Sequence, residues 1–287
     1  MNTKVISYLL GKISVLMGAA QVINLCMALY YGEKCYLQFL FSILLAVGLG
    51  YVLQFYGKDA SHKDISVREG IGTVFFAWIL AAGLAGLPFV FLQVLDPVSA
   101  YFEAMSGLTT TGATSISDLE VLPKSLLFWR AMNHWIGGIG IIVIFVALLP
   151  SMSGTAVYLY NAEVTGFSNS RILPRIRTTA IALFYIYLLL TIILTGILRG
   201  MGMDAYDAVY HAFSCIATGG FSDYNTSVAH FKSHMIEYAL SVFMVLAAGN
   251  FAVYYQVTQN GFKALWEDLE FKVYVVMVLC FSVAIAV

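Results

Sequence analysis

Charged residues are scarce in this chain of 287 residues. Asp, Glu, Lys and Arg together make up 11% of it, whereas soluble domains carry about a quarter. Apolar residues account for 60%, and the mean hydropathy is +0.84. So little charge cannot cover a large apolar core with a solvated surface, which excludes the soluble globular class. The composition therefore predicts an integral membrane protein.

Groups that carry enzyme, metal or nucleic-acid chemistry are also few. The four cysteines have no metal-like spacing, and neither His134 nor His211 has a second ligand at helical spacing. The apolar segments contain no paired aspartates, Ser/Lys dyad or His-Glu-x-x-His run. The net charge of −1 offers no basic surface to a nucleic acid. We therefore expect no enzyme, no bound cofactor and no nucleic-acid partner.

Long apolar segments dominate the chain instead. Crossing a hydrocarbon core of about 30 Å takes about 20 apolar residues in a helix, and six segments meet this requirement. These expected spans, which would face membrane lipid, are residues 13–31, 36–56, 71–95, 125–149, 179–198 and 236–256. A seventh begins near Phe271 and reaches Val287 without a polar flank, so we expect the sequence to be a fragment of a longer chain.

Basic residues predict the orientation of these spans. Lys and Arg are twice as frequent in the loops that share a side with the N-terminus as in the loops of the other side. The positive-inside rule then places the N-terminus in the cytoplasm. The opposite, outer loops are rich in Asp and Glu, which would concentrate cations there.

Two shorter stretches lie between spans, "DPVSAYFEAMSGLTTTGATSIS" from Asp96 and "DAYDAVYHAFSCIATGGFSDYN" from Asp204. Each opens with an aspartate that suits a helix N-terminus, continues for about three apolar turns, and ends in Thr, Gly and Ser. One interpretation is an amphipathic loop on the membrane surface. The other is a re-entrant hairpin, a half-helix that enters the bilayer and an extended strand that returns.

The two stretches form an internal repeat, which favours the re-entrant hairpin. They align without gaps at an offset of 108 residues, and an apolar span precedes and follows each copy. The aligned pairs include Asp96 with Asp204, Ser106 with Ser214, Thr110 with Thr218, and Gly112 with Gly220. We expect these aspartates and serines to support the two short helices.

A threonine and glycine core suits a filter that binds potassium through backbone carbonyl oxygens. Glycine permits the backbone angles that point successive carbonyl groups the same way, and threonine adds a hydroxyl oxygen. No Lys or Arg lies in either loop, which argues against an anion pore. The candidate filter residues are Thr110, Thr111 and Gly112 in the first loop and Thr218, Gly219 and Gly220 in the second.

Other polar residues of the expected spans have two interpretations each. For Arg130, the favoured one is an interface anchor beside Trp129, and the second is support of the loop by pairing with Glu103 or Asp118. Asn250 is expected to find a partner or to line a cavity, because an amide in a span is costly unless it is bonded. His211 is expected to form a hydrogen bond behind the filter. Gly137, Gly138 and Gly140 are expected to form a face for close helix packing.

Several long motifs, in the same order, resemble one family. They are "SGLTTTGAT", "FWRAMNHWIGGIGIIVIFVALLP", "NAEVTGFSNSRILPRIRTTA", "AFSCIATGGFS" and "AGNFAVYY". The chain resembles the potassium-uptake subunits of the Trk/Ktr superfamily of bacterial membrane proteins, above all its TrkH/TrkG branch, from its first expected helix to its last residue.

The resemblance implies an all-α, potassium-channel-like membrane fold of two leading helices followed by span, pore loop, span repeats, incomplete at the C-terminus. The expected boundaries are a leading hairpin at 1–69, a first repeat at 70–150, a cytoplasmic linker at 151–177, a second repeat at 178–258 and the start of a third at 259–287. The filter residues named above would bind potassium as the substrate, with Thr110, Thr111, Thr218 and Gly219 as its ligands.

The resemblance also implies partners and leaves alternatives. It implies a homodimer in the bacterial cytoplasmic (inner) membrane and a cytosolic nucleotide-binding regulatory subunit of the TrkA/KtrA type. The alternatives are a sodium-permeable or sodium-coupled relative, and a truncated form that does not conduct. In some branches a serine at the first filter glycine is associated with sodium, so Gly112 favours potassium.

Overall fold

The computed structural model describes residues 2–60, 67–140 and 173–286, and every regular element in these ranges is a helix. Much of the predicted linker at 151–177 and the end of the span predicted at 125–149 lie outside the described residues. Four described helices are long and apolar enough to cross a membrane, and a bent pair of helices would make a fifth span. The prediction of an all-α fold built on apolar helices is confirmed.

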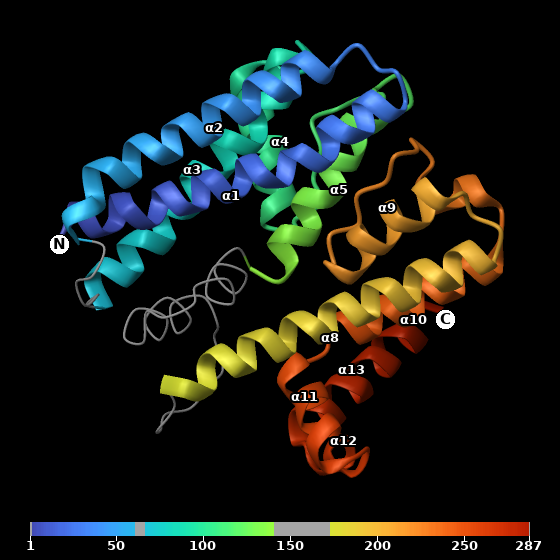
Figure 1. The fold of residues 1–287 in the computed structure, drawn as a ribbon. Coiled ribbons are helices and arrows are strands. Elements are labelled where there is room, and N and C mark those ends of the chain that lie inside the picture. The colour runs from blue at the N-terminus through green and yellow to red at the C-terminus, as the bar shows by residue number, and fades with distance from the viewer. Residues whose placement is uncertain (1, 61–66, 141–172, 287) are drawn as a thin grey trace.

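The first two helices, α1 (Thr3–Tyr30) and α2 (Tyr36–Gly57), lie side by side over most of their length (Figure 1). Small residues allow this close approach: a Cβ atom on Gly11 would lie 2.6 Å from the carbonyl oxygen of Gly50. The hydroxyl of Ser14 donates to the carbonyl oxygen of Ala46 at 2.6 Å. In a bilayer no hydrophobic driving force brings helices together, because lipid is as apolar as their side chains. Close packing at small residues and hydrogen bonds from serine hydroxyls hold the helices together instead.

Two units of the same kind follow this pair. The first comprises α3 (Val67–Phe91), the short α4 (Pro97–Leu108) and α5 (Lys124–Gly138). The second comprises α8 (Leu173–Gly200), the short α9 (Ala205–Ile216), the 3-10 helix η2 (Ser227–Phe231) and α10 (His234–Ala248). The helices α11 (Phe251–Asn260), α12 (Lys263–Glu267) and α13 (Leu269–Ala286) complete the described part.

The two units share a core. One cluster of buried side chains joins α1 to α5 and includes Tyr206 and Tyr210 from α9. A second cluster joins α8, α9 and α10. Because α9 contributes to both clusters, the second short helix ties the second unit to the first.

The span predicted at 236–256 is not one straight helix. It breaks between Ala248 and Phe251, and the axes of α10 and α11 differ by 87°. Gly249 takes an extended conformation, and the Asn250 side chain accepts a hydrogen bond from the N–H of Ala252, which makes it the N-cap of α11. Glycine is unfavourable inside a helix, and asparagine is a favourable N-cap. The helix therefore ends before Gly249, and a new one begins after Asn250.

Candidate functional site

The two short helices end in the same turn. The N–H of Thr110 donates to the carbonyl oxygen of Gly107, and that of Thr111 to Ser106; in the second copy Thr218 donates to Cys215, and Gly219 to Ser214. This is the pattern of the Schellman motif, which closes a helix by turning one residue into the left-handed region. Each partner is 108 residues from its counterpart, so the internal repeat extends to individual backbone hydrogen bonds.

Threonine occupies a strained conformation in both turns. The φ angles are +53° at Thr110 and +57° at Thr218, where glycine is the usual residue. A β-branched side chain at positive φ costs roughly 1–2 kcal/mol, and such strain collects at functional sites. Two residues further on, Gly112 and Gly220 also have positive φ, +74° and +82°. Alternating backbone reversals of this kind set the directions of successive carbonyl groups.

The two loops touch through their backbones. A Cβ atom added to Gly112 would overlap the carbonyl oxygen of Gly219, whereas one added to Gly220 would meet nothing within 4 Å. Gly112 is therefore required for two reasons, the positive φ and the contact, and Gly220 for the first alone. The structure thus brings the predicted residues of both loops together.

Helix α5 is the surface on which both loops rest. A Cβ atom on Gly137 would overlap the carbonyl oxygen of Leu108, at the end of α4. One on Gly138 would lie 2.8 Å from the Cα atom of Ala217, at the end of α9. Two of the three glycines predicted to form a packing face, Gly137 and Gly138, therefore do so, against the ends of the two short helices. The third, Gly140, lies beyond the end of α5 with a φ angle of +77°.

His134 of α5 also contacts the second loop and the short helix before it. Its ring stacks on the ring of Phe221 with centroids 3.9 Å apart, and its Nδ1 lies 3.2 Å from the hydroxyl oxygen of Ser214. Ser106, the counterpart of Ser214, instead donates to the carbonyl oxygen of Ala113 in its own loop at 2.6 Å. The two aligned serines both hold a loop, but through different partners.

The two aligned aspartates cap their helices. An Asp96 carboxylate oxygen accepts from the N–H groups of Val98 and Ser99 at 3.0 and 3.3 Å, and Asp204 accepts from Tyr206 at 3.3 Å. The hydroxyl of Ser99, and then its N–H, lower the pKa of Asp96 below its usual value. A charged carboxylate at this end complements the helix dipole.

Arg130 is not the interface anchor that the sequence favoured. Its side chain is 1% exposed, and its Nε donates to Glu103 Oε1 at 2.8 Å. The second interpretation, support of the loop through Glu103, is the one that the structure shows. Arg130 is buried partly by the second loop, where the carbonyl oxygen of Ser222, 92 residues away in the sequence, accepts a hydrogen bond from Nη1. The adjacent Trp129, on which the anchor interpretation rested, gives no sign of this long-range contact.

Asn250 lies apart from this group in its contacts. Its amide oxygen caps α11, and its amide nitrogen donates to the carboxylate of Glu270 at 3.1 Å. The expectation that this amide finds a partner is met at the helix break. Neither bond involves a candidate filter loop, so the break and the loops are separate features among the described residues.

Asp223 was not singled out from the sequence. It lies just beyond the second loop, is 5% exposed, and places Oδ1 3.7 Å from Nε2 of His211. Burial raises the pKa of the Asp223 carboxyl to about 7, and the charge of Asp207 adds to the rise. The Nδ1 of His211 lies 2.9 Å from the carbonyl oxygen of Asp207, one turn earlier in α9. Alignment with Ser115, a neutral residue, concealed Asp223 from a motif search.

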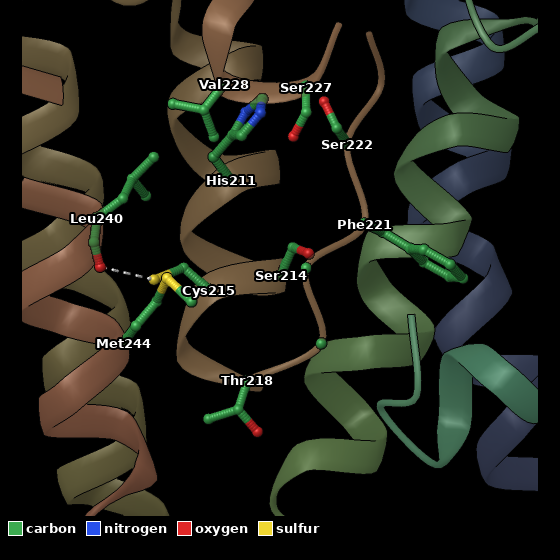
Figure 2. A pocket seen from close by; sticks show the side chains of 12 residues that line it. His211, Ser214, Cys215, Thr218, Phe221, Ser222, Ser227, Val228, Leu240 and Met244 are labelled. Carbon is green, nitrogen blue, oxygen red and sulfur yellow. Dashed lines mark hydrogen bonds between the residues drawn. The ribbon is translucent and has the colours of Figure 1, made fainter. Parts of the chain in front are cut away.

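A cavity of about 200 Å³ lies between the second loop and α10 (Figure 2). Cys215, Thr218 and Gly220 line one side, and Leu240 and Met244 line the other. In Figure 2, Phe221 points away from the labelled cavity residues of α10 and toward α5. The cavity is mostly apolar, so it offers little to a charged ligand.

Neutral oxygen atoms are the ligands that the loops can offer. Among the described residues, no group of three or more His, Cys, Asp or Glu side chains could hold a metal ion. Backbone carbonyl groups and threonine hydroxyls suit a weakly bound monovalent cation that must leave again, and the C-terminal end of each short helix adds partial negative charge.

The chain is similar to known transport proteins. The family model described as TrkH, cation transport protein, matches residues 38–286. The Trk system potassium uptake protein TrkH of Escherichia coli K12 is 34% identical over 279 residues, 96% of this chain and 58% of that protein. The Trk system potassium uptake protein TrkG of the same strain is 32% identical over 97% of this chain and 59% of its own length.

The fold agrees as well. The crystal structure of the potassium transporter TrkH from Vibrio parahaemolyticus matches with a TM-score of 0.83 and 32% identity, over 99% of this chain and 58% of that one. The chain thus spans somewhat more than half the length of the relatives that it matches.

Proposed function

Since the chain belongs to the TrkH family of cation transport proteins, we propose that it forms part of a potassium-uptake pathway across the bacterial cytoplasmic membrane. The matched relatives are transport proteins, so the expectation that the chain is not an enzyme is confirmed. The apolar helices and the family together make it a multi-pass membrane protein.

One observation carries the proposal for the filter. The turns at Thr110 and Thr218 repeat the same hydrogen bonds and the same positive φ angles, and their backbones touch at Gly112 and Gly219. Carbonyl groups held in two equivalent, adjoining loops can replace part of the hydration shell of potassium. In this proposal Thr110, Thr111 and Gly112 serve the ion together with Thr218, Gly219 and Gly220.

Alanine substitutions at the two glycines test the filter. Gly112→Ala adds both an unfavourable left-handed conformation and an overlap with Gly219. The complete protein with this change should therefore no longer support growth of potassium-uptake-deficient bacteria at low potassium. Gly220→Ala adds the strain alone, roughly 1–2 kcal/mol, and should slow uptake by about tenfold. Growth at low potassium and uptake of a rubidium tracer measure the two effects in the complete protein.

Gly83→Ala in α3 is the matched control, because a Cβ atom there meets nothing within 4 Å and φ is not positive. It should leave growth unchanged. Normal growth with Gly112→Ala, at normal protein level, would contradict the filter assignment.

The remaining expectations stay part of the proposal. The N-terminus lies in the cytoplasm, a second copy forms a homodimer, and a cytosolic nucleotide-binding subunit binds the cytoplasmic side. Lipid covers exposed apolar side chains such as Phe41, Leu44 and Phe55 of α2. The division at residues 69, 150, 177 and 258 follows the repeat. Labelling of single cysteines from each side of the membrane tests the orientation, and copurification of two differently tagged copies tests the dimer.

A further inference from the structure

We propose that Arg130 is a positioning residue that sets the separation of the two filter loops and thereby the ion selectivity. The inference rests on the proposed function and adds to it a residue outside both filter motifs.

Arg130 holds the first loop through a buried carboxylate. Its Nε donates to Glu103 Oε1 at 2.8 Å, and the side chains of Arg130 and Glu103 are 1% and 0% exposed. Glu103 in turn accepts from the hydroxyl of Thr114 at 3.0 Å and from the N–H of Ser115 at 2.9 Å. Charge-assisted bonds of this length in a buried site are strong and directional. The carboxylate thus fixes the segment that follows Gly112.

The other end of the same guanidinium holds the second loop. Nη1 donates to the carbonyl oxygen of Ser222 at 3.0 Å, and the guanidinium carbon lies 4.0 Å from the centre of the Phe221 ring. Nη2 reaches the hydroxyl of Thr114 at 3.3 Å. Thr114 and Ser222 are aligned positions of the two repeats, so one planar group spans equivalent points of the two loops. Figure 2 shows Phe221 directed out of the second loop toward α5, which carries Arg130.

The second repeat has no equivalent of the Arg130–Glu103 pair among its described residues. At the offset of 108, Glu103 corresponds to His211 and Arg130 to Tyr238. Tyr238 is 69% exposed. His211 has contacts to polar groups within its own repeat: Nδ1 lies 2.9 Å from the carbonyl oxygen of Asp207, and Nε2 lies 3.7 Å from Oδ1 of Asp223, the position aligned with Ser115. Among the described residues, the aligned positions Thr114 and Ser222 are therefore bridged by an arginine of the first repeat that has no counterpart in the second.

Lysine cannot replace this arginine. The guanidinium presents several N–H donors in a rigid plane, whereas an ammonium group is a compact point charge. Arg130→Lys would keep a positive charge for Glu103 and lose the simultaneous bond to Ser222. The variant separates the charge of Arg130 from its reach between the loops.

The test measures selectivity in the complete protein, reconstituted in lipid vesicles. Uptake of a rubidium tracer, which stands in for potassium, is measured against increasing sodium. In Arg130→Lys, sodium should inhibit this uptake at a concentration at least tenfold lower than in the unchanged protein. Arg199→Lys is the matched control, because Arg199 also donates to a backbone carbonyl, Met203 at 2.7 Å, but contacts neither filter motif. It should keep the preference of the unchanged protein. An unchanged preference in Arg130→Lys would overturn the proposal.

A second variant guards against misfolding. The double change Glu103→Gln with Arg130→Gln removes both charges together, so that no unpaired charge stays buried. It should fold, transport, and lack the preference for potassium; wild-type preference in it would also overturn the inference. Failure of the unchanged protein to take up rubidium would instead contradict the proposed function, which keeps the two failures distinct.

The separation of the loops can be measured without transport. Asp118 and Asn225 bond across the two outer loops at 2.8 Å, so Asp118→Cys with Asn225→Cys, in a background without the native cysteines, should be joined by a short bifunctional thiol-specific reagent. Adding Arg130→Lys should slow this cross-linking severalfold, and an unchanged rate would contradict the positioning role.

Discussion

At the scale of single residues, the sequence motif identifies the threonines of each loop, but only the structure shows which of them takes the strained, left-handed conformation. The sequence offers three consecutive threonines, Thr109 to Thr111, with no indication of which one turns the chain. Of the three, only Thr110 turns the chain, because α4 ends at Leu108, Thr109 is its C-cap, and the Schellman bonds require a left-handed residue next. The offset of 108 predicts that Thr218 does the same, and it does.

Asp223 makes stability depend on pH. Its pKa is raised from the usual 3.8 to about 7 in the folded protein, so the protonated form is favoured by folding. The resulting stabilisation is complete below pH 4 and is lost as the pH rises through about 7. The difference amounts to about 4 kcal/mol. Unfolding by sodium dodecyl sulfate in mixed micelles, between pH 5 and pH 8.5, should show lower stability at the higher pH.

Asp223→Asn should remove most of this dependence, since the amide does not ionise. Asp59→Asn is the control, because the Asp59 side chain is 68% exposed and should leave the dependence intact. A steep dependence that survives in Asp223→Asn would show that another group is responsible.

At the scale of elements, the seat of the loops on α5 shows the limit of pattern reading. The glycines of "WIGGIG" predict a face for close packing, and Gly137 and Gly138 do pack closely. The pattern did not indicate that their partners are the ends of two short helices. Those partners come from α4 and α9, and only the folded chain brings them to one helix. The bend in the sixth expected span was not predicted for a related reason, because hydropathy measures composition and is insensitive to a cap at Asn250.

Gly137→Ala should be severely destabilising. The added Cβ atom would overlap the carbonyl oxygen of Leu108, a backbone atom that cannot move without displacing the first loop. Overpacking of this kind costs about 1–3 kcal/mol or more. Gly196→Ala in α8 is the control, because its Cβ atom would meet nothing within 4 Å. Equal unfolding curves for the two variants in mixed micelles would contradict the packing described for α5.

At the scale of the whole molecule, the two repeats are interlocked by α9. Tyr206 is buried in the cluster formed by α1 to α5, and its hydroxyl donates to the carbonyl oxygen of Lys124 at 2.9 Å. The repeat was predictable from aligned motifs, but this interlocking was not, because Tyr206 corresponds to Val98, which is 79% exposed. Equivalent positions in a repeat thus have different surroundings.

Tyr206→Ala should therefore loosen both units. Removing a buried aromatic side chain costs about 3–5 kcal/mol, and the unfolding transition in mixed micelles should shift accordingly. Tyr238→Ala, at a tyrosine that is 69% exposed, should shift it by less than about 0.5 kcal/mol. If both changes have equally small effects, Tyr206 does not join the two units.

The break between α10 and α11 bears on how the chain enters the membrane during synthesis. At about 1.5 Å per residue, the 15 residues of α10 reach about 22 Å and the 10 residues of α11 about 15 Å, so neither alone crosses a core of about 30 Å. Residues 234–260 are long and apolar enough to cross only when the two helices are taken together. The cap at Asn250 is local to the break, but the bond from Asn250 to Glu270 and the bond from Tyr274 to Val245 both require α13, so the later helix holds a bend that the local sequence has already made.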